Sequence, residues 1–326
     1  MIGTLDPGLV ERFRSDVEAL FAGSGRLALA VSGGPDSMAM LALAAIAFPG
    51  RVTAATVDHR LRAASASEAE MVAGFAQMLG IDHAVLVPAE PITGASVQAQ
   101  ARAARYALLV NWAKEADAAA LLTAHHADDQ AETFLMRAAR GSGVPGLAGI
   151  RARRALAPDL LLLRPLLGWR RAELRALAEA QGLPFVDDPS NRDPMHDRTR
   201  FRALLEADPL LDIAGLAASA RFVAEAEEAL EVVADRCWAD REAQEARVTI
   251  AVAGLPREIA RRLARRAIGE VRRVAAIRAP AWSDAVNIEP LLDALEAGRA
   301  ATQAGVKAAP KGKYWLFSPA PPRRSH

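Results

Sequence analysis

Short continuous runs of apolar residues alternate with longer stretches of mixed polarity over the first part of the chain. An uninterrupted apolar run is typical of a strand buried on both faces, and a longer stretch with one apolar face predicts a helix. The pattern predicts strands at 27–31, 52–57, 84–87, 120–123 and 160–163, and helices at 38–48, 67–79, 96–115, 128–140 and 170–181. Strands separated by helices favour a doubly wound α/β fold with a parallel sheet.

The pattern changes after Pro189, where a polar stretch leads to a long helical run that starts at 216 and ends near 247. We therefore place a domain boundary near Pro209, with one domain at 1–209 and a smaller, mainly helical domain at 210–326. One short strand is expected at 248–252. The chain end joins glycine, proline and basic residues to a short aromatic stretch, which predicts either a small β element or a loose tail.

Composition narrows the class of protein. With 326 residues, 52% of them hydrophobic, the chain can bury two cores. No apolar run reaches the roughly 18 residues of a membrane span, and the charged N-terminal segment does not resemble a signal peptide, so we expect a cytoplasmic protein with no membrane contact. A single cysteine, Cys237, excludes disulfides, cysteine-rich metal sites and paired-thiol chemistry within this chain.

The net charge of +1 conceals an asymmetry. Residues 1–250 carry 26 basic and 33 acidic side chains, which gives −7, whereas residues 251–326 carry 14 and 6, which gives +8. Of the 40 basic residues, 36 are arginine. Arginine suits forked contacts to phosphate, although a GC-rich genome would enrich arginine for no functional reason.

The segment SGGPDS stands directly between a predicted buried strand and a predicted helix. A glycine-rich turn at this place presents backbone N–H groups and a helix N-terminus to an anion. We expect a phosphate to bind there, held by Ser32, Gly33, Gly34, Pro35, Asp36 and Ser37. Because Asp36 would repel a phosphate unless a cation lay between them, Mg²⁺ is the natural partner. The alternative is a simple turn with Asp36 as the helix N-cap.

The same segment excludes two common nucleotide-binding patterns. It contains neither GxxxxGK[ST] nor GxGxxG, which disfavours a kinase or a dehydrogenase.

A second segment, TAHHADDQAET at 123–133, also runs from a strand end into a helix. Asp128 and Glu132 are four apart on that helix, with Asp129 beside them, and paired carboxylates suit Mg²⁺. We expect Asp36, Asp128 and Glu132 to be metal ligands. His125 is the candidate general base or phosphate contact, with His126 as the alternate. The alternative is an acidic helix start with one structural histidine.

These motifs resemble a known family. SGGPDS is similar to the PP-loop of the N-type ATP pyrophosphatases, which cleave ATP between the α and β phosphates and have an adenine nucleotide alpha hydrolase-like fold. Together with HHADDQAET, the following RAARGSGVPGLAGI and RPLLGWRRAEL, it resembles the tRNA(Ile)-lysidine synthetases over about residues 26 to 202. Another PP-loop tRNA-modifying or nucleotide ligase, or a non-enzymatic ATP-binding RNA module, remain alternatives.

The resemblance implies ATP-dependent ligation of free L-lysine to C2 of the wobble cytidine of tRNA(Ile) with the anticodon CAU. The base is first adenylated, with release of pyrophosphate, and the lysine ε-amine then displaces AMP to give lysidine. The basic C-terminal domain is expected to contact the tRNA through its arginine-rich helix at 260–273 and its aromatic end, where Tyr314 and Trp315 either stack on bases or pack. Assembly of the chain into a homodimer is left open by the sequence.

The resemblance also implies roles for single residues. Arg102 and Arg105, three apart on one helical face, are expected to stabilise charge on the α phosphate, and Asp128, Asp129 and Glu132 to bind the metal or the lysine ammonium. Substrate or tRNA contacts are expected from Arg198, Arg200 and Arg202, which would scatter on a helix and align in an extended segment. For Asp187 and Asp188, a turn before Pro189 and a substrate contact remain equally open.

Overall fold

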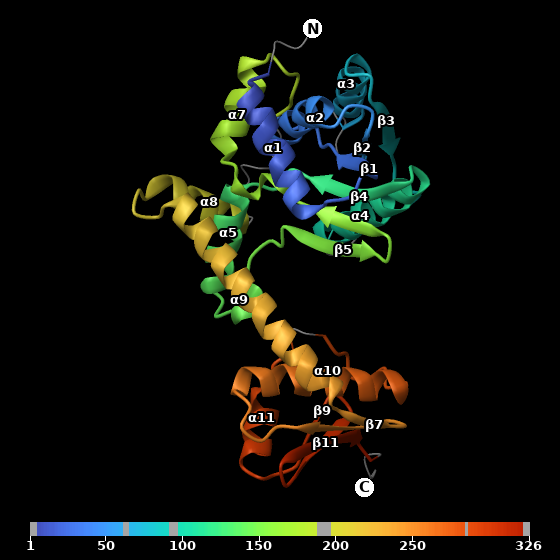
Figure 1. Cartoon of the computed structure of the whole chain (residues 1–326), viewed down its shortest axis with the longest axis vertical. Coiled ribbons are helices and arrows are strands. Elements are labelled where there is room, and N and C mark those ends of the chain that lie inside the picture. Colours follow the sequence, from blue (N-terminus) through green and yellow to red (C-terminus); the bar gives the residue numbers. More distant parts are fainter. Residues whose placement is uncertain (1–4, 61–64, 91–96, 188–196, 284–285, 322–326) are drawn as a thin grey trace. The chain divides into compact units, whose positions relative to one another are not determined.

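The computed structural model describes residues 5–60, 65–90, 97–187, 197–283 and 286–321 (Figure 1). The chain forms two compact units, Met1–Ala224 and Glu225–His326. The division lies inside one long helix, α9 (Ile213–Ala239), rather than at Pro209. The polar stretch around Pro209 ends one helix and starts the next, so a break in the sequence pattern does not coincide with a break between cores.

The first unit is built on a six-stranded sheet with the order β3-β2-β1-β4-β6-β5. Five neighbouring strands are parallel, and β5 pairs antiparallel with β6 at one edge. The strands are β1 (Arg26–Ala30), β2 (Val52–Val57), β3 (Asp82–Leu86), β4 (Ala118–Thr123), β5 (Arg153–Ala157) and β6 (Leu160–Leu163). The predicted α/β class is confirmed, while β5 was not predicted because its two arginines interrupt the apolar pattern.

Helices cover both faces of this sheet, as a doubly wound fold requires. Leu27 and Leu29 of β1 lie in one core with side chains of α1, α2, α3 and α7, whereas Ala28 lies in the opposite core with Leu109 and Ala113 of α4. Alternate residues of one strand thus serve different layers. The helical elements of the unit are α1 (Pro7–Leu20), α2 (Pro35–Ala47), α3 (Ser65–Met78), α4 (Val97–Glu115), α5 (Ala127–Ala138), α6 (Val144–Leu147), the short 3₁₀ helix η1 (Pro165–Gly168), α7 (Arg171–Ala180) and α8 (Asp197–Ala207).

The second unit combines helices with a small sheet. Its five antiparallel strands have the order β7-β8-β11-β10-β9, and α10 and α11 pack on the sheet. Its elements after α9 are β7 (Glu242–Gln244), β8 (Arg247–Ala251), α10 (Arg257–Val274), α11 (Glu289–Glu296), β9 (Ala301–Gln303), β10 (Val306–Lys311) and β11 (Tyr314–Pro319). The predicted strand at 248–252 is present, and the aromatic end forms β11 rather than a loose tail. Trp315 is only 5% exposed, so it packs, whereas Tyr314 is 46% exposed.

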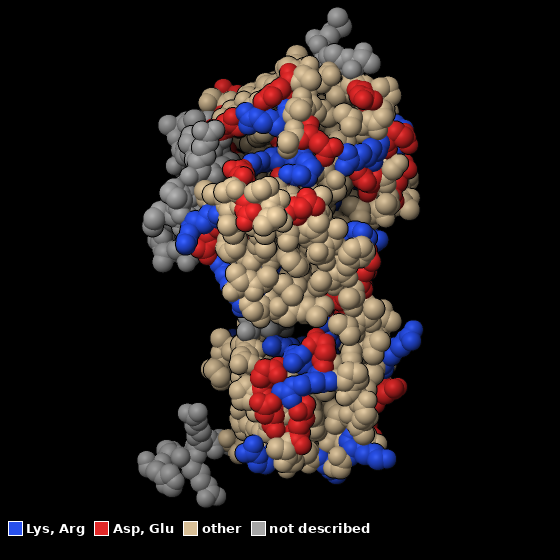
Figure 2. All heavy atoms as spheres, turned by 90° about the vertical axis from the view of Figure 1, so that its left-hand side faces the viewer, with Lys and Arg blue, Asp and Glu red and all other residues tan. Residues whose placement is uncertain are grey.

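The arginine-rich face of α10 is occupied within its own unit. Arg262, 7% exposed, donates to both carboxylate oxygens of Glu227, and Arg266 pairs with Asp235 at 2.7 Å. Further ion pairs join Arg257 and Arg261 to acidic residues of α10 and α11. Figure 2 shows acidic and basic side chains interleaved on one face of this unit. Carboxylates therefore hold four arginines of this helix, Arg265 and Arg272 donate to backbone carbonyls, and Arg273 is exposed without an ion pair to the described residues. Contact of this helix with RNA stays a prediction.

In the described part of the chain, no helix is both long and apolar enough to cross a lipid bilayer.

Candidate functional site

The loop after β1 has the geometry of an anion site. Gly33 has φ +82°, a backbone conformation that favours glycine, and α2 begins at Pro35, two residues later. The Ser37 hydroxyl accepts a hydrogen bond from the Ser32 N–H at 3.1 Å and donates to the Gly34 carbonyl at 3.0 Å. The N–H of Val186 donates to the Gly33 carbonyl at 2.9 Å, which ties the loop to the segment after α7. The loop is thus held in shape at the N-terminus of a 13-residue helix.

Asp36 lies in the first turn of α2 without a hydrogen-bond partner for one of its oxygens. Its Oδ1 is buried and accepts no hydrogen bond from the described residues, and Oδ2 lies 3.7 Å from His126 Nε2. Burial raises the pKa of this carboxyl, because the charged form loses solvation. The N-cap of α2 is Gly34, so the alternative that Asp36 caps the helix is wrong. A buried carboxylate oxygen without a donor fits a cation ligand.

His126 joins the start of α5 to this loop. Its imidazole Nδ1 accepts a hydrogen bond from the backbone N–H of Asp129 at 3.3 Å. The backbone N–H of His126 in turn donates to Asp129 Oδ2 at 3.0 Å, which completes a reciprocal capping arrangement. The side chain is almost fully buried, and its Nε2 faces Asp36 and Asp129. His126 therefore positions the acidic helix start against the PP-loop, which leaves His125 as the better candidate for a proton acceptor.

His125 follows β4 and is held neutral by its surroundings. Burial lowers the pKa of His125 to about 4, and the charges of Arg164 and Arg102 act in the same direction against that of Asp129. Its Nδ1 lies 3.0 Å from Thr123 Oγ1. In the tautomer whose Nδ1–H donates to Thr123, the Nε2 lone pair is free to accept a proton.

We expect the imidazole of His125 to titrate near pH 4 in the folded protein, well below the ordinary value of about 6.5. Because the unfolded chain binds this proton more readily, the group's contribution to stability is present above about pH 6.5 and is lost as the pH falls towards 4. The Cε1–H resonance, assigned by its disappearance in His125→Asn, measures the titration by NMR. A midpoint at or above 6.5 would contradict the described environment.

Asp128 connects α5 to the start of α7. The N–H of Arg171 donates to its Oδ2 at 2.8 Å, and Arg170 Nε donates to the same oxygen at 3.2 Å. Burial acts to raise the pKa of Asp128, but these two donors outweigh it and the net shift is downward. The carboxylate therefore stays charged and is already partnered by cationic residues.

Glu132 is 1% exposed and receives two guanidinium groups. Arg198 Nε and Arg202 Nε each donate to one of its oxygens at 2.7 Å, and Arg198 Nη2 also donates to Asp129 Oδ1 at 2.9 Å. Burial acts to raise the pKa of Asp129, but nearby positive groups outweigh it and the net shift is downward. The segment is helical, so Arg198 and Arg202 share a face of α8. Arg200 is exposed and has no hydrogen bond or ion pair with the described residues.

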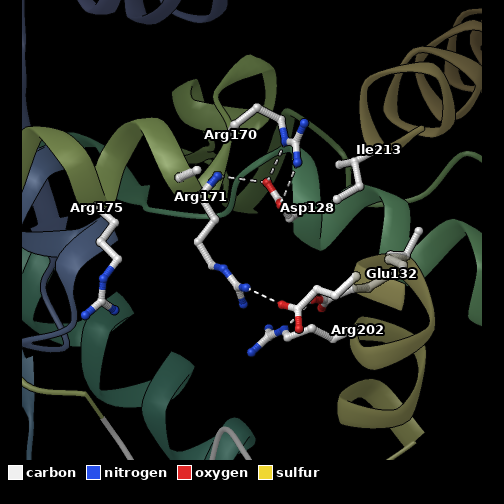
Figure 3. Close-up of a pocket in the computed structure, with 10 residues that line it drawn as sticks. Asp128, Glu132, Arg170, Arg171, Arg175, Arg202 and Ile213 are labelled. Atoms are coloured by element: carbon white, nitrogen blue, oxygen red, sulfur yellow. Dashed lines mark hydrogen bonds and ion pairs between the residues drawn. The ribbon is translucent and has the colours of Figure 1, made fainter. Parts of the chain in front are cut away.

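These side chains border a cavity of about 380 Å³ between α5, α7, α8 and the start of α9 (Figure 3). Its wall contains carboxylates and guanidinium groups together, which are the complements of a zwitterion. The residues that line it are Asp128, Glu132, Arg170, Arg171, Ala172, Arg175, Arg202, Leu205, Glu206 and Ile213. The sequence analysis missed Arg170, Arg171 and Glu206, although the RR pair after the strand at 160–163 was a usable signal.

The three residues predicted as metal ligands differ in how the structure places them. Among residues 5–60, 65–90, 97–187, 197–283 and 286–321, no three histidine, cysteine or acidic side chains form a group that could hold a metal ion. Asp128 and Glu132 already accept from arginine groups, whereas Asp36 has an oxygen without a donor. The arrangement favours Asp36 as the protein ligand of a cation that phosphate oxygens would complete.

The remaining predicted residues lie on the first unit as well. On α4, Arg105 Nε donates to His59 Nε2 at 3.4 Å, and Arg102 lies 5.2 Å from the centre of the Tyr106 ring. Burial and the charge of Arg102 lower the pKa of Arg105. Asp187 accepts two hydrogen bonds of 2.8 Å from Arg175, which favours the structural interpretation, and Asp188 lies outside the described residues.

Comparisons with known proteins agree with this geometry. A family model described as a PP-loop domain matches residues 9–207. The tRNA(Ile)-lysidine synthase of Zymomonas mobilis is 44% identical over 306 residues, which cover 92% of this chain and 90% of that protein. The protein of the same name from Novosphingobium aromaticivorans is 46% identical over 321 residues, covering 98% and 96%.

Among solved structures, the U34-tRNA thiolase NcsA from Methanococcus maripaludis has a TM-score of 0.53 at 16% identity, over 68% of this chain and 78% of that one. A likeness at this level of identity concerns the fold alone, and it agrees with the adenine nucleotide alpha hydrolase-like architecture.

Proposed function

From the premise that the chain belongs to the tRNA(Ile)-lysidine synthase family, we propose how its own residues carry out the ATP-dependent formation of lysidine on tRNA(Ile). The family reaction is a ligation that consumes ATP. The observation that carries the residue assignments is the meeting of the PP-loop, the half-buried Asp36 and the start of α5 at one edge of the sheet. A cavity with charges of both signs opens beside the same helix.

The first step places ATP on the loop from Ser32 to Ser37. Backbone N–H groups and the N-terminus of α2 bind the β and γ phosphates, which leave as pyrophosphate. The C2 carbonyl oxygen of the wobble cytidine attacks the α phosphate, and the bond between the α phosphorus and the bridging oxygen breaks. Arg105, supported by Arg102, stabilises the negative charge that develops on the α phosphate.

Asp36 is the residue that would hold Mg²⁺. Its raised pKa and its buried Oδ1, which has no hydrogen-bond partner among the described residues, both describe a carboxylate that a cation would stabilise in the charged form. When bound, the ion would offset the charge of the departing pyrophosphate. Asp128 and Glu132 as further metal ligands remain a prediction that their arginine partners do not favour.

The second step requires L-lysine, for which the cavity of Figure 3 is suited. Asp128 and Glu132 on the cavity wall, with Asp129 behind them, are proposed to offer carboxylates to its ammonium groups, and Arg171 and Arg202 to offer guanidinium groups to its carboxylate. The ε-nitrogen lone pair attacks C2, the bond between C2 and the AMP oxygen breaks, and the neutral His125 accepts the proton released by the amine. A phosphate contact remains the alternative role of His125.

Contacts to tRNA are proposed on both units. Arg200 is the exposed arginine of α8, so of the three arginines of that segment it is the one available for RNA. On the second unit, where most arginines of α10 already have hydrogen-bond partners, the proposed contact is the hairpin of β10 and β11. Its exposed Lys307, Lys311 and Lys313 have no ion pair with the described residues, and Tyr314 is exposed beside them.

The test of this function is a reconstitution. Purified protein, ATP, Mg²⁺ and labelled L-lysine are incubated with tRNA(Ile) of anticodon CAU, and the nucleosides are analysed after digestion. Lysidine that requires both tRNA and ATP is the expected product. Turnover of ATP that does not depend on lysine would indicate another PP-loop ligase, and binding of ATP and RNA without turnover would indicate a non-enzymatic module.

A cytoplasmic location and a homodimer remain predictions. The homodimer can be tested by measuring the mass of the protein in solution.

A further inference from the structure

A group of arginines lies on the side of His125 that is away from the PP-loop. Along the sheet order β1-β4-β6-β5, the carboxyl end of β1 leads to the PP-loop, that of β4 to His125 and that of β6 to Arg164. His125 therefore stands between the PP-loop and Arg164 on one edge of the sheet. Because β5 is antiparallel, it starts at the same edge, where Arg153 pairs with Leu163.

Arg164 is a buried cation with no acidic partner among the residues that the structure describes. The residue is 6% exposed, its Nη1 donates to the Arg151 carbonyl, and its Nε is buried without a hydrogen-bond partner in the part of the chain that the structure describes. Tyr106 of α4 makes a side-chain hydrogen bond with it. Burial lowers the pKa of Arg164, and the charges of Arg154 and Arg102 act in the same direction.

The surroundings of Arg164 add positive charge instead of cancelling it. From 137 to 164 the sequence contains six arginines and a single acidic residue, Asp159. Arg102 and Arg154 are exposed, and neither makes an ion pair with a carboxylate of the described residues. Elsewhere in this unit arginines meet acids, as Arg171 meets Glu206 at 2.6 Å. Grouped cations without a counter-charge lower the stability of a fold, which points to an anion that the protein binds at this place.

We propose that Arg164 and Arg154 bind a backbone phosphate of the tRNA next to the cytidine that is modified, with Arg102 adding to the field. The proposal rests on the proposed function, since it takes tRNA as the substrate. The pyrophosphate of ATP is accounted for by the PP-loop on the other side of His125. RNA brings a phosphate on each side of its reacting nucleotide, and a guanidinium group matches two phosphate oxygens. Fixing that phosphate would orient the base towards the α phosphate.

Arg154, the exposed residue of the pair, is substituted to test the proposal, and Arg153 on the same strand is substituted as the control. Arg154 and Arg153 are adjacent on β5, so their side chains leave opposite faces of the sheet, and the charge of Arg154 is among the main influences on the pKa of Arg164. We expect Arg154→Gln to weaken binding of full-length tRNA(Ile) by about 5–10-fold and to reduce the slope of log K against log salt by about 1. Arg153→Gln makes the same charge change and should stay within about twofold of the wild type.

Binding is measured by filter retention of labelled tRNA without ATP, at several salt concentrations, and the KM for ATP is measured separately. Arg164→Lys keeps the charge but loses the fork, and is expected to raise the KM for tRNA while leaving that for ATP unchanged. Its thermal unfolding is recorded to exclude loss of fold, and Arg154→Gln carries the test if Arg164→Lys does not fold.

Two results would overturn the proposal. If Arg154→Gln weakens ATP and not tRNA, the anion is the α phosphate. If Arg153→Gln and Arg154→Gln weaken tRNA equally, the attraction is diffuse and no site exists. Failure of the proposed function can be distinguished from failure of the proposed phosphate site. A wild-type protein that binds tRNA but forms no lysidine would contradict the proposed reaction and leave the phosphate site in place.

Discussion

Asp36→Asn should abolish lysidine formation, with a loss of about 1,000-fold or more in rate, while leaving the protein folded. A loss of that size corresponds to about 4 kcal/mol in the activation barrier. The amide has the shape of the carboxylate but no charge, so it cannot hold the cation that would offset the departing pyrophosphate. The initial rate of pyrophosphate release with saturating ATP and tRNA(Ile) measures the effect at the first step.

The same substitution should not destabilise the fold. Burial raises the pKa of Asp36, which means that the charged side chain is unfavourable in the folded protein at neutral pH. We therefore expect a midpoint of unfolding equal to or above that of the wild type. Asp82→Asn is the matched control, because Asp82 is an exposed residue of β3 and loses the same charge without loss of activity. Substantial turnover by Asp36→Asn would rule out the proposed role of this carboxylate.

Glu132→Gln is expected to separate the two chemical steps. The carboxylate accepts from Arg198 and Arg202 and borders the cavity proposed for lysine. The amide keeps the volume but loses the charge that holds the arginines and attracts an ammonium group. We expect kcat/KM for lysine to fall by about 100-fold or more, equivalent to about 3 kcal/mol, while pyrophosphate is still released in a single turnover.

The readout combines two assays on one preparation. Rapid-quench measurement of pyrophosphate reports adenylation, and lysidine analysis of the same tRNA reports the transfer of lysine. Glu70→Gln on α3 is the control, since Glu70 is exposed and makes the same chemical change away from the site. We expect Glu132→Gln to lower the free energy of unfolding by about 1–3 kcal/mol, because two guanidinium groups lose a charged partner. Equal losses in both assays would show that Glu132 does not act at the lysine step.

Local sequence was sufficient to predict the strand, turn and helix at which we propose that ATP binds. The strand at 27–31, the glycine-rich turn and the helix that follows are contiguous, and their conformations depend on neighbouring residues and on the apolar pattern. The turn between β1 and α2 was therefore predicted where the structure has it, while phosphate binding by Ser32–Ser37 stays a prediction. The strand β5 escaped prediction because it is an edge strand with two exposed arginines, and its place is decided by pairing with β6.

The acceptor end of the site depended on contacts between distant segments. Periodicity could not show whether Arg198 and Arg202 share a face, because an extended segment and a helix give opposite answers; the helix α8 directs both to Glu132, which is 66 and 70 residues away. Asp128 likewise meets Arg170 and Arg171 only in the folded chain. The structure also distinguished the two neighbouring histidines, because His126 caps α5 and His125 does not.

By itself, the sequence determined the α/β architecture of the first unit, the PP-loop and the segments that carry the acidic and basic groups. Only the tertiary structure decided which of those charges neutralise one another and which remain open to a ligand. The physical reason is that a charge is satisfied or left unsatisfied by groups that the folded sheet edge brings within hydrogen-bond distance, and these come from strands and helices that are far apart in the chain. Hence Arg262 of α10 proved to be paired with Glu227 inside its own unit, whereas the buried Arg164 did not stand out in the sequence at all.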